Sequence, residues 1–221
     1  MNSKIHLEIL DKKRQKILEQ LFELLKKEKY YLAGGTALAL QIGHRQSFDF
    51  DLFKNAPVSF ALKRKVIKAF GAYSLQTLID TADELTLALD QEIKITFLSY
   101  FWDPIFPLIK SPKTIPLLGI KDIALTKAYA LGRRGNYRDY FDLYAIIKNK
   151  YISLEKIIDG SKKKYGELFS ERMFLEQLTY LEDLQYDEKL IFLGEKNISK
   201  KNLSRFFKKE VLGLRRHWGP R

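Results

Sequence analysis

Residues 30–53 read YYLAGGTALALQIGHRQSFDFDLF and contain the two patterns that decide the fold, a Gly-Gly-Thr turn and an Asp-x-Asp pair. Polar and apolar residues alternate from 47 to 52, which is typical of a half-buried strand. Asp49 and Asp51 therefore point to the same face of that strand. Because two neighbouring carboxylates repel each other, we expect a cation or a shared proton between them.

The turn before this strand offers groups that suit a phosphate. Gly34 and Gly35 let the backbone approach a ligand closely, and Thr36 can cap the helix that follows. The N-terminus of a helix attracts phosphate through its backbone N–H groups. Mg²⁺ accepts carboxylate oxygens and takes further ligands from substrate phosphates. The stretch therefore predicts a magnesium- and nucleotide-binding site.

Two runs in this stretch, GGTAL at 34–38 and GHRQSFDFDLF at 43–53, together resemble the first motif of the AbiEii-type nucleotidyltransferases. These are DNA-polymerase-β-like enzymes that serve as toxins in toxin–antitoxin and phage-defence systems. The resemblance implies an α/β (α+β) fold, in which a small mixed sheet with flanking helices carries the Asp-x-Asp strand and a helical C-terminal lobe closes the active-site cleft.

The resemblance also implies a role for each residue of the motif. Asp49 and Asp51 would bind Mg²⁺ and act in catalysis. Five residues would contact the nucleotide: Gly34, Gly35, Thr36, Arg45 and Ser47. From the residues alone, Arg45 could equally pair with Asp49 or cap the end of a helix.

One position departs from the family pattern. Residues 86–89 and 93–100 read as a hairpin, and in the family the second strand normally carries a third acid, as in Val-Lys-Val-Asp-Phe. Here the matching residues are Ile-Lys-Ile-Thr-Phe, with Thr96 in the acidic position. A threonine offers one neutral oxygen and cannot act as a base at neutral pH, while Asp90 and Glu92 lie too far along the strand to replace it. Three alternatives stay open: one metal suffices, the substrate supplies the missing oxygens, or the enzyme is weakened.

A lysine in the second half of the chain lies where lysine is uncommon. Lys127 is in the middle of a predicted helix, and its neighbours three and four positions away are all apolar. The next predicted helix, 137–148, carries Asp139 and Asp142 on one face. The pattern indicates a buried Lys–Asp network, either as part of a site or as a salt bridge that pins two helices together. The alternative is that the lysine extends along the apolar surface to reach water.

The same segments resemble the third and fourth motifs of the family, in LTKAYALGR at 125–133 and RDYFDL at 138–143. By this resemblance Lys127 would contact the nucleotide phosphates and neutralise developing charge. Asp139 would be the fourth-motif acid that orients or activates the acceptor, with Asp142 in support.

Two lobes are expected along the chain, a nucleotidyltransferase core at 1–105 and a helical lobe at 106–221. Four of the six prolines fall within 101–119, which predicts an irregular connection there. Apolar spacing predicts an amphipathic first helix at 5–28. The remaining predicted helices span 57–70, 153–165, 169–185 and 199–212.

The composition fits a globular protein, with 46% hydrophobic and 30% charged residues in 221. It contains no cysteine, which excludes disulfides and zinc thiolate sites, and no apolar run reaches the roughly 18 residues of a membrane span. We therefore expect a cytoplasmic protein without a membrane partner. The net charge of +12 favours polyanionic partners. Phe206, Phe207 and Trp218 lie among the basic residues of the C-terminal segment, so this segment could bind RNA or could simply be solvated.

The function that follows is Mg²⁺-dependent transfer of a nucleoside monophosphate from an NTP to an RNA, including tRNA, or to a protein. The toxin role implied by the resemblance adds a cognate antitoxin as a partner. One alternative is a nucleotide- or partner-binding module of the same fold, since Thr96 replaces the third acid. Another is a nucleic-acid-binding protein that depends only on its basic C-terminus.

Overall fold

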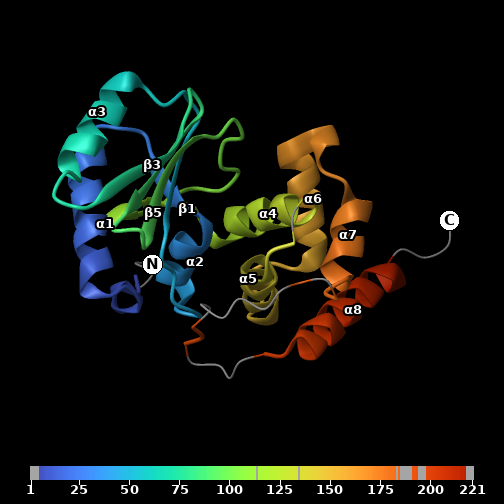
Figure 1. Cartoon of the computed structure of the whole chain (residues 1–221). Helices are drawn as coiled ribbons and strands as arrows, with labels where there is room; N and C mark the ends of the chain where they lie inside the picture. The colour runs from blue at the N-terminus through green and yellow to red at the C-terminus, as the bar shows by residue number, and fades with distance from the viewer. Residues whose placement is uncertain are drawn as a thin grey trace. The chain divides into compact units, whose positions relative to one another are not determined.

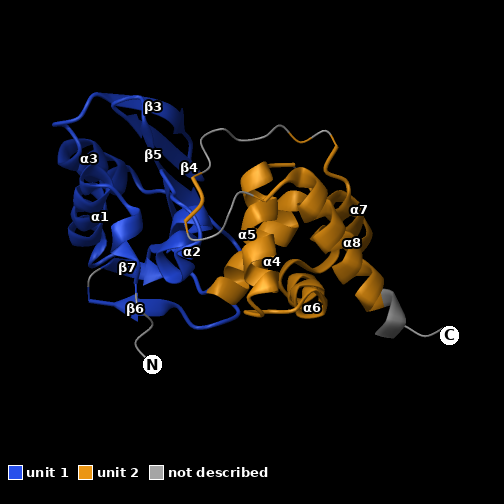
Figure 2. Ribbon diagram, turned by 90° about the horizontal axis from the view of Figure 1, so that it is seen from below, with its two compact units in different colours: residues 1–119 blue, residues 120–221 orange. Residues whose placement is uncertain are grey.

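The computed structural model describes residues 5–112, 114–133, 135–182, 184, 191–193 and 198–217. The chain forms two compact units, 1–119 and 120–221 (Figure 2). Residues 106–119, which the sequence analysis gave to the second lobe, belong to the first unit.

The first unit is built on one mixed sheet. The described strands run in the order β3-β4-β5-β2-β1-β7-β6, with β2/β5 and β1/β7 parallel and the other pairs antiparallel. Figure 1 shows this sheet, with β1, β3 and β5 labelled. This confirms the predicted α/β class. The elements are η1 (Leu7–Ile9), α1 (Lys12–Leu25), β1 (Tyr31–Ala33), α2 (Gly34–Ile42), β2 (Phe50–Lys54), α3 (Phe60–Ala69), β3 (Leu75–Asp80), β4 (Glu84–Leu89), β5 (Ile93–Ser99), β6 (Ile109–Ser111) and β7 (Thr114–Leu117).

A row of apolar side chains crosses five strands and forms the centre of the core. Leu117, Leu32, Leu52, Phe97 and Leu85 are successive partners on β7, β1, β2, β5 and β4, and each is at most 1% exposed. Since side chains alternate along a strand, the next row points to the opposite face of the sheet. Asp51, one of the predicted site residues of this unit, belongs to that opposite face.

The expectation of irregular structure at 101–119 was wrong, because β6 and β7 lie within it. Three of its prolines fall outside the strands, and only Pro116 is part of β7. A proline removes one hydrogen-bond donor from a ladder. The burial of Ile115 and Leu117 on either side offsets this loss, since the two side chains are 1% and 0% exposed.

The first helix is shorter than the predicted 5–28. It begins after Asp11, whose side chain accepts a hydrogen bond from the backbone N–H of Arg14 at 2.8 Å. An aspartate in this position satisfies one of the free N–H groups of the first turn. The residues before Asp11 form the short η1 helix instead.

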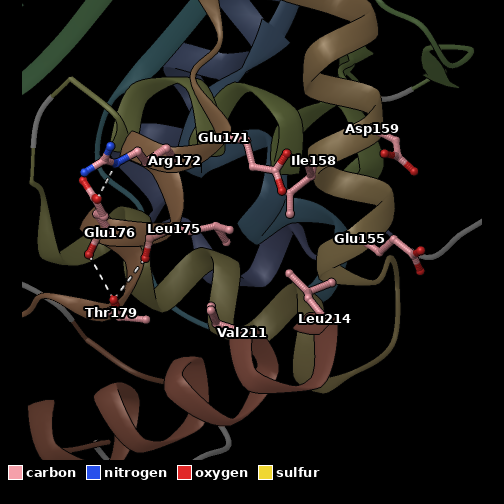
Figure 3. A pocket seen from close by; sticks show the side chains of 10 residues that line it. All are labelled: Glu155, Ile158, Asp159, Glu171, Arg172, Leu175, Glu176, Thr179, Val211 and Leu214. Carbon is pink, nitrogen blue, oxygen red and sulfur yellow. Dashed lines mark hydrogen bonds and ion pairs between the residues drawn. The ribbon is translucent and has the colours of Figure 1, made fainter. Parts of the chain in front are cut away.

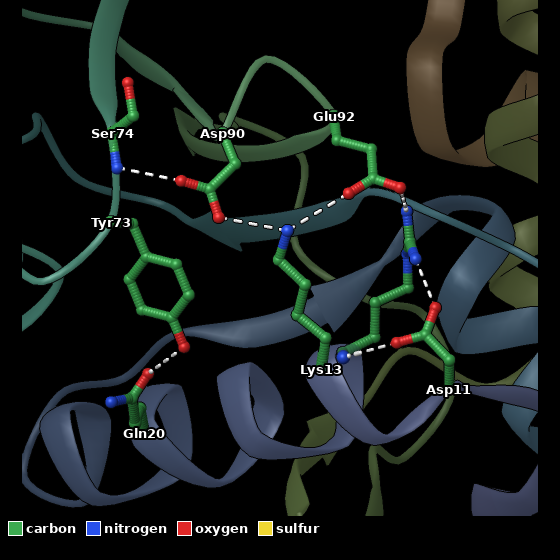
Figure 4. Close-up of polar contacts among 8 residues, drawn as sticks. Asp11, Lys13, Gln20, Tyr73, Ser74, Asp90 and Glu92 are labelled. Atoms are coloured by element: carbon green, nitrogen blue, oxygen red, sulfur yellow. Dashed lines mark hydrogen bonds and ion pairs between the residues drawn. The ribbon is translucent and has the colours of Figure 1, made fainter.

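Ion pairs connect α1 to the turn between β4 and β5 (Figure 4). The Lys13 ammonium lies 3.0 Å from carboxylate oxygens of both Asp90 and Glu92. The hydrogen bond to Asp90, with that to Glu92, raises the pKa of Lys13, and the same bond to Lys13 lowers the pKa of Asp90. Arg14 donates to the Phe48 carbonyl at 3.3 Å, so α1 also holds the backbone next to the predicted aspartate strand.

The second unit is helical in its described part, and its helices pack on one another. α4 contacts α5, α6 and α7, while α8 contacts α5, α6 and α7. Helix α7 ends at Thr179, short of the predicted 185. The helices are α4 (Ile120–Leu131), α5 (Tyr137–Lys148), α6 (Leu154–Tyr165), η2 (Gly166–Leu168), α7 (Glu171–Thr179) and α8 (Lys200–His217). In the described residues, we find no helix with the length and apolarity that a membrane span requires.

The β4–β5 turn gives a prediction about stability. Asp90 and Gln91 have φ angles of 52° and 59°, and the Glu92 N–H donates to the Leu89 carbonyl at 3.0 Å, as in a type I′ turn. Gln91→Gly should raise the free energy of unfolding by about 0.5–1 kcal/mol, because glycine adopts positive φ without the steric penalty of a side chain. Urea denaturation measures this change. Gln91→Ala retains a Cβ and should give no such gain, so an equal gain in both variants would contradict the explanation.

Candidate functional site

The polar face of the sheet is centred on Asp51. Asp51 on β2 is the register partner of Thr96 on β5, and Thr96 is the partner of Thr86 on β4. Asp51 and Thr96 are partly exposed, whereas the apolar row beside them is buried. The carboxylate of β2 and the threonine in the family's acidic position are therefore neighbours on one face.

The glycine turn fits closely around Asp51. Gly34 has φ +64°, and a Cβ built on it would lie 2.1 Å from Asp51 Oδ2. Glycine is needed here because a side chain would both strain the backbone and collide with the carboxylate. The start of α2 and the Asp51 carboxylate are thus in direct contact within the first unit.

Asp49 accepts one hydrogen bond from a backbone N–H and one from a side-chain hydroxyl. Its Oδ1 accepts a hydrogen bond from the Lys94 backbone N–H at 3.1 Å, and its carbonyl accepts one from the Thr36 hydroxyl. Thr36 Oγ1 also lies 2.8 Å from Ser47 Oγ. The expectation that Thr36 caps α2 was wrong, since Ala33 is the N-cap and makes no side-chain hydrogen bond. Thr36 is 1% exposed and ties the helix to the aspartate strand instead.

Arg45 is buried against the same turn. It is 2% exposed, and its Nη1 donates to the Gln46 carbonyl at 2.9 Å. A Cβ on Gly35 would lie 2.2 Å from Arg45 Nη2, so the guanidinium packs directly on this glycine. Ser47 is buried as well, at 7% exposure. Both residues support the turn, and their predicted contact with phosphate stays a prediction.

The donor set suits a Mg²⁺ ion with few protein ligands. Asp49 and Asp51 both remain partly exposed, and carboxylate oxygens are the ligands that Mg²⁺ prefers. In the described part of the chain, no three His, Cys, Asp or Glu side chains form a group that could hold a metal ion. Asp49 and Asp51 are the residues that would hold such a cation, whose other ligands would come from water and phosphate.

In the second unit, the predicted Lys–Asp network is present. Lys127 Nζ lies 2.5 Å from Asp139 Oδ1 and 2.8 Å from Asp142 Oδ2. The three side chains are 10%, 6% and 0% exposed, so the lysine does not extend along the surface to water. The lysine of α4 therefore links two buried carboxylates of α5, which constrains how the two helices pack. The predicted contact of Lys127 with phosphate stays a prediction.

A second buried ion pair, between Lys164 and Asp122, was not predicted from the sequence. Lys164 Nζ lies 2.7 Å from Asp122 Oδ1, with side-chain exposures of 2% and 0%. Lys164 is the last of three consecutive lysines on α6, and such a run resembles a solvated face. Helical spacing was the signal that could have placed Lys164 on the buried face of α6, since it lies three positions after Ser161, which is buried.

A groove of about 690 Å³ lies among α6, α7 and α8 (Figure 3). Its lining combines apolar and acidic side chains, and Arg172 on its rim donates to Glu176 at 2.8 Å. None of the predicted site residues lines it. The lining residues are Glu155, Ile158, Asp159, Glu171, Arg172, Leu175, Glu176, Thr179, Val211 and Leu214.

Comparison with known proteins identifies the family of this chain. The profile of the family described as nucleotidyl transferase AbiEii toxin, type IV TA system, matches residues 16–217. An uncharacterised protein of Aquifex aeolicus is 35% identical over 183 residues, covering 79% of this chain and 84% of that protein. The chain therefore belongs to the AbiEii family of nucleotidyltransferase toxins.

Solved structures show the same fold at low identity. The toxin MenT4 of Mycobacterium tuberculosis aligns with a TM-score of 0.60 and 14% identity, covering 89% of this chain and 80% of that one. A proposed nucleotidyltransferase of Helicobacter pylori aligns with a TM-score of 0.57 and 16% identity, covering 94% and 98%. The fold is that of the polymerase-β-like nucleotidyltransferases.

The contact between Gly34 and Asp51 gives a prediction about the site. Gly34→Ala should lower the free energy of unfolding by at least about 1–2 kcal/mol, because alanine at positive φ is strained and its Cβ must displace the carboxylate. Urea denaturation measures the loss. Gly71→Ala is the matched control, since the nearest atom to its added Cβ would be 3.5 Å away. Equal stability of the two variants would contradict this account of the turn.

The buried lysine gives a prediction about the second unit. Lys127→Met should destabilise the protein by about 3–5 kcal/mol, because it leaves Asp139 and Asp142 as buried carboxylates without their cation. Lys156→Met on the exposed surface of α6 serves as the control. Thermal unfolding followed by circular dichroism measures both. A similar midpoint for the two variants would show that the network contributes little to stability.

Proposed function

We propose that this protein transfers a nucleoside monophosphate from an NTP to an acceptor hydroxyl or phosphate and releases pyrophosphate. The observation that carries the proposal is the contact of the Gly34–Gly35 turn with the Asp51 carboxylate, beside Asp49. A phosphate-binding turn and two metal-binding carboxylates then act on the same triphosphate. Membership of a nucleotidyltransferase family supports this reading of the site.

The residues of the first unit have distinct roles in this proposal. Asp49 and Asp51 would hold Mg²⁺, which when bound neutralises phosphate charge and polarises the α-phosphorus. The start of α2 has no side-chain cap, so its backbone N–H groups and helix dipole favour the triphosphate there. Thr36 keeps Asp49 in place through its carbonyl. These fixed groups orient the triphosphate and reduce the reorganisation needed during reaction.

We propose RNA, including tRNA, as the acceptor in preference to a protein. Helix α8 exposes a row of basic side chains at helical spacing, which would neutralise backbone phosphates. Phe206 and Phe207 on this helix are not available to stack on bases, because Phe207 is 0% exposed and Phe206 packs edge-on against Tyr144 at 4.9 Å. Trp218 lies outside the described residues. The exposed basic residues are Lys201, Arg205, Lys208 and Lys209.

The family assignment extends the proposal to the cell. A toxin of a toxin–antitoxin system should arrest growth when it is expressed without its antitoxin, and the same activity would serve phage defence.

A second function is supported by one specific residue. Thr96 is the register partner of Asp51 and supplies no negative charge of its own. A protein with this site could bind Mg²⁺ and NTP without turning the NTP over. Calorimetric binding of Mg²⁺–NTP with no release of pyrophosphate would favour this binding module over the enzyme.

The aspartate pair gives the decisive test of the enzyme. Incubation with each labelled NTP and total RNA should label RNA with the wild type, and Asp49→Asn should lower the rate by at least about 10²–10³-fold, since a fixed charge at the reacting phosphates is lost. Asp103→Asn is the matched control because Asp103 is exposed and its bond to Asn55 survives the change. Labelling by Asp49→Asn at the wild-type rate would overturn the assignment, and labelled protein in place of RNA would change the acceptor.

A further inference from the structure

Glu84 is an acidic residue that the sequence analysis did not single out. It lies at the start of β4, two residues before Thr86, so both side chains point to the same face of the sheet. Thr86 Oγ1 is 2.6 Å from Glu84 Oε1 and 3.2 Å from Thr96 Oγ1. Thr96 is in turn the register partner of Asp51. Two hydroxyls thus connect the position beside Asp51 to a carboxylate two strands away.

The direction of these hydrogen bonds follows from the number of protons. An ionised carboxylate only accepts, so the single proton of the Thr86 hydroxyl points to Glu84. Thr86 then accepts from Thr96, whose own proton points away from Asp51 and toward Thr86. The lone pairs of Thr96 Oγ1 are left as acceptors on the side of the site. The chain is ordered from Thr96 through Thr86 to Glu84.

The Glu84 carboxylate is bonded to the Thr86 hydroxyl. The 2.6 Å contact with Thr86 is short for an O–H···O bond, which is typical of a charged acceptor. Glu84 is partly exposed, so a proton that reaches it can pass to water.

We propose that Glu84 is the proton acceptor of the reaction and acts through the hydroxyls of Thr86 and Thr96. This inference depends on the proposed nucleotidyl transfer. Glu84 supplies the base of the reaction, since the Thr96 hydroxyl cannot act as a base by itself. Glu84 is a positioning and proton-accepting residue at a distance, because it does not touch the reacting atoms.

The proposed step balances in protons and electrons. The acceptor oxygen forms a bond to the α-phosphorus while the bond from that phosphorus to the pyrophosphate oxygen breaks, and pyrophosphate leaves with the electron pair. The proton of the acceptor hydroxyl passes to Thr96 Oγ1, the proton of Thr96 passes to Thr86 Oγ1, and the proton of Thr86 passes to Glu84 Oε1. Glu84 becomes neutral and then releases its proton to water.

The test compares kcat and KM for NTP in four variants with the wild type. Glu84→Gln keeps an acceptor for Thr86 but cannot take a proton, and it should lower kcat by about 10²-fold while KM changes by less than about threefold. Thr86→Val breaks the chain and should lower kcat to a similar extent. The double variant should lose no more than either single one, since both act on one proton path. Asp83→Asn, an exposed charge next to Glu84, is the control and should match the wild type.

A fifth variant tests rescue. Thr96→Asp in the Glu84→Gln background places a carboxylate beside Asp51 and should restore most of kcat, which a purely structural role of Glu84 would not predict. If Glu84→Gln keeps the wild-type kcat while Asp49→Asn is inactive, the inference fails and the nucleotidyltransferase stands. A rise in KM without a fall in kcat also overturns it. A wild type that transfers no nucleotide overturns both proposals, and equal labelling by wild type and Asp49→Asn overturns the proposed function.

Discussion

The register of β2 against β5 is the constraint on which the first unit depends. One row of partners, from Leu117 through Leu32, Leu52 and Phe97 to Leu85, is buried. The adjacent row brings together Asp51, Thr96 and Thr86 on the other face. A shift of one residue would move the aspartate into the core and Leu52 into water, so burial of the apolar row fixes the position of the polar one. The same strand register therefore determines both the stability of the sheet and the geometry of the site.

The second unit follows a different principle, in which buried charges orient helices. Lys127 is enclosed by Asp139 and Asp142, and Lys164 by Asp122, all at 10% exposure or less. Such pairs add little net stability compared with apolar packing, but breaking one is costly. They therefore specify how α4 meets α5 and α6 more than they stabilise the unit. A buried network of this kind is compatible with a catalytic role and does not require one.

The threonine in the acidic position changes how the site can be understood. Compared with the acid that the family carries at this position, Thr96 leaves the polar face of the sheet with one negative charge fewer. With its hydrogen bonds included, it is the first member of a chain that ends at a carboxylate on the next strand. A hydroxyl chain keeps the negative charge away from Asp51, which avoids the repulsion that a third adjacent carboxylate would cause.

The sequence by itself determined the turn and strand of the first motif and the Lys127 network, because these depend on local periodicity and on residues close in the chain. The α/β class followed from the resemblance of these motifs to the AbiEii-type nucleotidyltransferases. It mispredicted the proline-rich segment, since burial of Ile115 and Leu117 against distant strands outweighs the local cost of Pro116. It also missed Glu84 and the Lys164–Asp122 pair. Only tertiary structure decided these, because the bond from Thr86 to Thr96 joins two strands and the Lys164–Asp122 pair joins two helices, at separations in sequence that carry no period.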